Sequence, residues 1–123
     1  MIPENIRYYD EVLTMSAYMA SFTHDNKWIE RYEEAVLPLE NTLAIARKTF
    51  PEIIIYLDEI EEEVDTLISL ERQSFELLKE DRFKEAQALL FSEKYNESKK
   101  EYNKVSSFTT LWLPEFTSIK AIA

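Results

Sequence analysis

Hydrophobic residues recur along most of the chain at the three- and four-residue spacing of amphipathic helices. In the first such segment, about residues 3–22, one stripe holds larger apolar side chains, Val12, Met15, Met19 and Phe22. An adjoining stripe holds Tyr9, Leu13, Ser16 and Ala20. The polar residues 23–26 then form a turn, and the helical spacing resumes over residues 27–49. A polar turn this short predicts that the second helix returns antiparallel to the first.

Two further long helices and a short one between them are predicted for the rest of the chain. A helix ending near Lys79 carries one carboxylate on its apolar stripe, which consists of Ile53, Leu57, Ile60, Val64, Leu67, Glu71, Phe75 and Leu78. A short helix over residues 82–90, capped by Asp81, precedes a last helix capped by Ser92. Pro114 is expected to end or kink that last helix.

These segments predict an all-α protein, an antiparallel up-down four-helix bundle with a short extra helix between helices 3 and 4. The absence of glycine supports this fold class, because strand-rich folds need glycine in hairpin turns and bulges. We expect one domain over residues 1–113 and a C-terminal tail, residues 114–123, whose structure the pattern does not specify. Up-down order places the residue 23–26 turn and the short extra helix at one pole, opposite the chain termini.

Charge and composition exclude several classes of function. The net charge is −10, and residues 1–71 hold 16 acidic and 5 basic residues. Such a surface argues against binding to nucleic-acid phosphates or to an anionic membrane face. No cysteine, glycine-rich phosphate loop or metal-ligand spacing is present, and His24 is the only histidine. We therefore expect a non-catalytic domain without a metal or another cofactor.

Two stretches carry a resemblance to a known group of proteins. Residues 10–16 read DEVLTMS, and Trp28, Arg31 and Tyr32 follow the polar turn. This pattern resembles the N-terminal sensing region of bacterial membrane signalling proteins, among them sensor histidine kinases and diguanylate cyclases. Ile29 stands where the family has an acidic residue, and His24 where glycine is usual. A second match covers residues 70–72, Phe75 and residues 86–95, so the resemblance spans most of residues 8–102.

The resemblance implies an extracytoplasmic sensor domain, on the periplasmic or extracellular side of the bacterial cytoplasmic membrane. The parent protein would be anchored by flanking membrane helices and would pass a helix shift to a cytoplasmic kinase or cyclase. No run in this chain approaches the roughly 18–20 apolar residues of a membrane span. The partners expected are a small-molecule ligand and a second copy of the chain in a homodimer. The alternative is a helical interaction or dimerisation module without a ligand.

Both family-like stretches lie toward the same pole, which predicts a ligand cavity there between the helices. Its expected walls are Met15, Met19, Trp28, Arg31, Tyr32, Glu71 and Tyr95. The alternative is that the apolar residues of this set, which recur at helical spacing, simply pack in the core. Glu71 is the exception, because a carboxylate on an apolar stripe is costly unless it is paired. Arg31 or Lys99 could pair with it in a structural ion pair, or Glu71 could be the charged wall of the cavity.

Overall fold

The computed structural model describes the backbone of residues 2–122 and the side chains of residues 5–107. Every regular element in this part of the chain is helical. The elements in chain order are α1 (Ile2–Thr23), α2 (Asn26–Thr49), the short 3-10 helix η1 (Pro51–Ile53), α3 (Ile54–Lys79), α4 (Phe83–Leu90) and α5 (Glu93–Ile122). Apart from the C-terminal end of α5, the predicted helix boundaries agree with these bounds to within about three residues.

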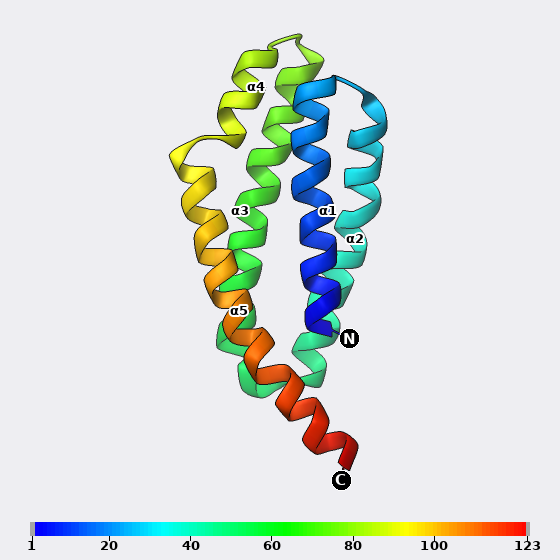
Figure 1. The fold of residues 1–123 in the computed structure, drawn as a ribbon, viewed down its shortest axis with the longest axis vertical. Helices are drawn as coiled ribbons and strands as arrows, with labels where there is room; N and C mark the ends of the chain where they lie inside the picture. The colour runs from blue at the N-terminus through cyan, green and yellow to red at the C-terminus, as the bar shows by residue number, and fades with distance from the viewer. Residues whose placement is uncertain (1, 123) are drawn as a thin grey trace.

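The helices form the predicted antiparallel bundle, with successive long helices running in opposite directions (Figure 1). α1 packs against α2, and α3 packs against both α4 and α5. The short helix α4 also contacts α1 near the pole that holds the α1–α2 turn, and α5 contacts α1 nearer the termini. α4 and α5 together therefore occupy the place of the fourth helix, and the fold prediction is confirmed.

The predicted inward face is correct for α3 and shifted for α1. The whole predicted stripe of residues 53–78 is buried, including Glu71. On α1, in contrast, Met15 and Phe22 are more than half exposed, and the buried positions include Leu13, Ser16, Ala17 and Ala20. Small side chains face inward because α1 contacts each of the other α-helices, and close approach leaves little room for large ones.

Two non-glycine residues end helices in the left-handed backbone region. His24 follows α1 with φ 58°, and its amide donates to the carbonyl of Ala20. Asp81 follows α3 with φ 59°, where glycine is the usual residue. We expected Asp81 to cap the next helix, but α4 has no side-chain cap and follows Arg82. Ser92 caps α5 as predicted, accepting from the amide of Tyr95, and Asp25 caps α2 by accepting from the amide of Lys27.

We predict that Asp81→Gly stabilises the protein by about 0.5–1 kcal/mol, because glycine adopts a positive φ without a steric penalty. The gain is limited by the greater freedom of glycine in the unfolded chain. Chemical denaturation measures the difference. Asp65→Gly, an exposed position within α3, is the control and should lower stability. A loss of stability in Asp81→Gly equal to that of the control would contradict this account of the turn.

The last helix continues beyond the point where the sequence predicts an end. α5 includes Pro114 and runs to Ile122. Tyr95, Tyr102 and Val105 of α5 are buried, whereas the side chains of Thr109 and Trp112, which continue the same spacing in the sequence, lie outside the described residues. Among the described residues, no helix combines the length and apolar character that crossing a membrane requires.

Candidate functional site

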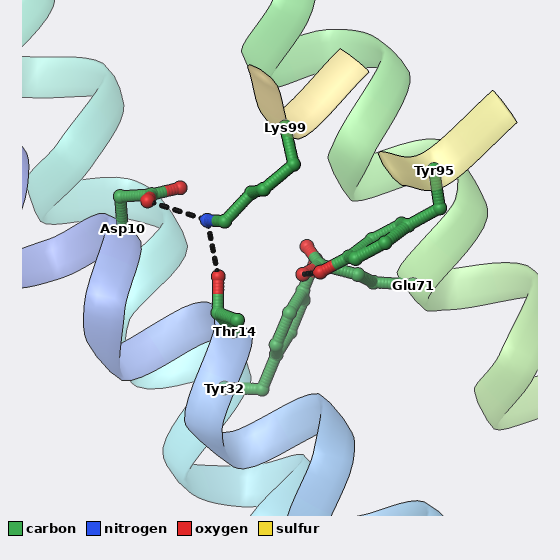
Figure 2. Close-up of polar contacts among 6 residues, drawn as sticks. All are labelled: Asp10, Thr14, Tyr32, Glu71, Tyr95 and Lys99. Carbon is green, nitrogen blue, oxygen red and sulfur yellow. Dashed lines mark hydrogen bonds and ion pairs between the residues drawn. The ribbon is translucent and has the colours of Figure 1, made fainter. Parts of the chain in front are cut away.

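A buried carboxylate lies at the centre of the bundle, held by two tyrosines from different helices. Glu71 of α3 is 2% exposed. Tyr32 of α2 donates its hydroxyl hydrogen bond to Oε1 of Glu71, and Tyr95 of α5 donates to Oε2, each at 2.8 Å (Figure 2). Each carboxylate oxygen thus has one neutral donor. The three side chains connect three helices through a single polar contact.

Burial controls the ionisation of Glu71. Loss of hydration raises the pKa of its carboxyl from 4.5 to about 7, and the hydrogen bonds from Tyr32 and Tyr95 and the charge of Lys99 oppose that rise. Desolvation dominates because neutral hydroxyl donors replace only part of the hydration of a carboxylate. Near neutral pH, Glu71 is therefore divided between its protonated and ionised forms. Burial, and after it the charge of the same carboxylate, raises the pKa of both tyrosines.

A second polar group lies beside the first and joins α1 to α5. Lys99 donates from Nζ to Oδ2 of Asp10 at 2.7 Å and to Oγ1 of Thr14 at 2.6 Å (Figure 2). The Asp10 side chain is 10% exposed and that of Lys99 is 22% exposed. Burial raises the pKa of Asp10, although the charge and hydrogen bond of Lys99 act against the rise. The ammonium also lies 5.4 Å from the centre of the Tyr102 ring.

This ion pair lines a hollow between α1 and α5 with a volume of about 690 Å³. Met15, Tyr18 and Met19 supply apolar wall from α1, while Tyr102 supplies an aromatic wall from α5. Polar residues complete the lining: Arg7, Asp10, Glu11, Thr14, Lys99, Asn103, Ser106 and Ser107. A concave surface of this size with a few inward polar groups is typical of a small-molecule site.

The structure divides the seven predicted site residues into three groups. Tyr32, Glu71 and Tyr95 lie together in the core. Met15 and Met19 line the hollow between α1 and α5. Trp28 and Arg31 line a separate shallow depression on α2, with Lys27, Glu30 and Glu34. The seven residues therefore do not surround one cavity, and their role in binding a ligand stays a prediction.

Two expectations about this region need correction. Neither Arg31 nor Lys99 is hydrogen-bonded to Glu71: Arg31 is exposed on α2, and Lys99 bonds to Asp10 and Thr14 instead. The principal hollow extends toward the pole with the termini. A second hollow, of about 450 Å³, lies at the predicted pole, but none of the seven residues lines it. The rings of Tyr32 and Phe75 instead meet edge to face at 4.8 Å beside Glu71.

Asp10, Thr14 and Tyr102 were missed as site residues. Asp10 and Thr14 fall one helical turn apart on α1, and this spacing places them on one face. The available signal was that Asp10 lies at a three-residue spacing from Leu13, within the buried stripe of α1. Only the tertiary arrangement shows that Lys99, far along the chain, meets both residues.

The described residues contain no group of three or more histidine, cysteine or acidic side chains placed to hold a metal ion. His24 is exposed in the α1–α2 turn, and its ring stacks on that of Phe83 at 3.7 Å between centroids. This contact fixes the turn against α4 and gives His24 a structural role.

Comparisons of the chain with protein-family models, with curated proteins and with solved structures find no match. The description of the molecule therefore rests on its sequence and its structure. It is an all-α protein of four packed helices. Among the residues whose side chains are described, two acidic residues are buried, and one of them faces a hollow between the first and last helices.

Proposed function

We propose that this chain is the extracytoplasmic sensor domain of a bacterial transmembrane signalling protein and that it binds a small molecule between α1 and α5. The observation that supports binding is the hollow of about 690 Å³ crossed by the Asp10–Lys99 ion pair. The compartment and the kinase or cyclase output rest on the resemblance of residues 10–32 and 70–95 to such sensors. The domain itself is non-catalytic in this proposal.

The arrangement of the helices suits transmission of a signal. α1 and α5 carry the two chain termini, and both termini lie at the same pole of the bundle (Figure 1). Lys99 connects these two helices through Asp10 and Thr14. A ligand that enters the hollow changes those contacts and so shifts α5 relative to α1. Small displacements of packed helices are a common means of passing a signal through a protein.

A ligand-free interaction or dimerisation module is the second candidate function. Apolar side chains on the outside of the described bundle favour it: Phe22 is 54% exposed and Phe91 57%, and their rings lie 6.2 Å apart. An exposed apolar patch of this kind often marks a protein contact. The homodimer expected for a sensor would use such a surface, and light scattering after gel filtration measures whether the chain dimerises.

A thermal-shift screen of small metabolites tests the sensor proposal. A ligand present at 100 times its Kd should add about 2.7 kcal/mol of stability, because it binds only the folded state. Asn103 is exposed and lines the hollow, so Asn103→Trp should fill the hollow and abolish the response. Asn41→Trp, an exposed position on α2, is the matched control and should respond like wild type. A screen without any stabilising compound, or equal responses from both variants, would count against the proposal.

A further inference from the structure

The buried charges around the hollow do not balance. Asp10 and Glu71 are the two acidic residues with less than a tenth of their whole-residue surface exposed among the described residues. Lys99 is the cation hydrogen-bonded within this group, and it is bonded to Asp10 rather than to Glu71. At the rim of the hollow, Arg7 and Glu11 carry opposite charges. With both buried carboxylates ionised, the group therefore has one negative charge in excess.

A buried group with excess charge is stabilised by a proton or by another cation. The hollow offers a route by which a cation could reach these carboxylates. Asp10 lines it, and only one carboxylate oxygen of Asp10 receives the hydrogen bond from Lys99. The rings of Tyr18 and Tyr102 form part of the wall, and aromatic faces attract cations. Met15 and Met19 add polarisable apolar surface on the same side.

We propose that the hollow binds an organic cation, a protonated amine on an apolar body, whose ammonium group supplies the missing positive charge beside Asp10 and Glu71. The ammonium would donate to Asp10 from the hollow, and the apolar body would lie against Tyr18 and the two methionines. The net charge of −10 attracts cations to the domain in addition. This inference rests on the proposed sensor function and specifies the chemical class of its ligand.

Proton release should accompany binding. The carboxyl of Glu71 has its pKa raised to about 7 by burial, so a cation bound nearby favours its ionised form. The titratable and charged groups that face the Glu71 carboxyl come from α1, α2 and α5. They are Asp10, Tyr18, Tyr32, Tyr95 and Lys99. We expect the affinity for a cation to be about tenfold higher at pH 8 than at pH 6.

Three probes of similar size and different charge test the proposal by isothermal titration calorimetry at pH 8. They are 2-phenylethylammonium, neutral 2-phenylethanol and anionic 3-phenylpropanoate. The ammonium should bind at least about tenfold more tightly than the alcohol, and the carboxylate should bind most weakly. Tightest binding of the carboxylate, equal binding of all three probes, or no binding of the ammonium at millimolar concentration would overturn the proposal.

Variants separate the charge requirement from the existence of the site. Asp10→Asn should weaken binding of the ammonium probe about tenfold or more. Lys99→Met removes the competing cation and should tighten that binding, whereas an anion site would lose its ligand in this variant. Glu33→Gln, exposed on α2, is the control and should bind like wild type. If metabolites from the thermal-shift screen bind in the hollow but are neutral or anionic, this inference fails and the sensor function stands. If no compound of any class binds, both fail.

Discussion

The free energy of unfolding is expected to fall by roughly 3 kcal/mol as the pH rises from about 4 to 8, through Glu71 alone. Replacing Glu71 by glutamine should remove that part of the pH dependence. The glutamine carbonyl can accept from one tyrosine, and its amide can donate to the other hydroxyl. We therefore expect Glu71→Gln to match wild type at pH 4 and to exceed it in stability at pH 8.

The sign follows from where the proton is bound. Burial raises the pKa of Glu71 to about 7 in the folded protein, above its ordinary value of 4.5. Between these two pH values the folded state holds a proton that the unfolded state has released. Stability is therefore greatest below the lower pKa and is lost as the pH rises through the higher one. Asp10, whose pKa is also raised, acts in the same direction.

Urea denaturation at a series of pH values gives this dependence for wild type and for Glu71→Gln. Glu76→Gln, an exposed residue on the same helix, is the matched control and should retain the wild-type pH dependence. If wild type and Glu71→Gln show the same dependence between pH 4 and 8, the pKa of Glu71 is the same in the folded and unfolded states, which would contradict the account of its burial.

The double variant Tyr32→Phe/Tyr95→Phe should lose roughly 2–4 kcal/mol of stability at pH 8, because it leaves the Glu71 carboxylate without a hydrogen-bond donor. The loss is limited because the carboxyl can take up a proton instead. Its pKa should rise above the wild-type value of about 7, since the lost hydrogen bonds favour the ionised form. Each single variant should give an intermediate loss.

Thermal denaturation of the two single variants and the double variant measures these losses. Tyr102→Phe removes a buried hydroxyl of the same type that is not bonded to Glu71, so it should leave the pKa of Glu71 unchanged. A double variant as stable as wild type at pH 8 would mean that the two hydroxyls do not stabilise the carboxylate.

The helices and the burial of Glu71 could be predicted from the sequence because both depend on local spacing. The apolar residues of α3 recur at one helical turn over residues 53–78, and Glu71 falls within that stripe. The same reasoning could not identify its partners. It favoured cations such as Arg31, whereas the structure supplies two phenols that also serve as core side chains.

On α1, the spacing of apolar residues did not predict which face of the helix is buried. Its larger apolar side chains predict one inward face, but a helix at close range to several others buries its smaller residues, such as Ala17 and Ala20. That shift places Asp10 in the interior and turns Met15 toward the hollow. The hollow itself depends on the angle between α1 and α5, which no local pattern specifies. Likewise, Asp81 resembles a helix cap in sequence but occupies a left-handed position.

Titration of the Glu71 side-chain carboxyl carbon by heteronuclear NMR, with and without 2-phenylethylammonium, tests the account of the buried charges most directly. The account predicts a midpoint near pH 7 in the free protein and a lower midpoint in the presence of the cation. The resonance of the Glu71 carboxyl carbon is assigned as the one that is missing from the spectrum of the Glu71→Gln variant. A midpoint near the ordinary value of 4.5, or one that the bound cation leaves unchanged, would contradict the account.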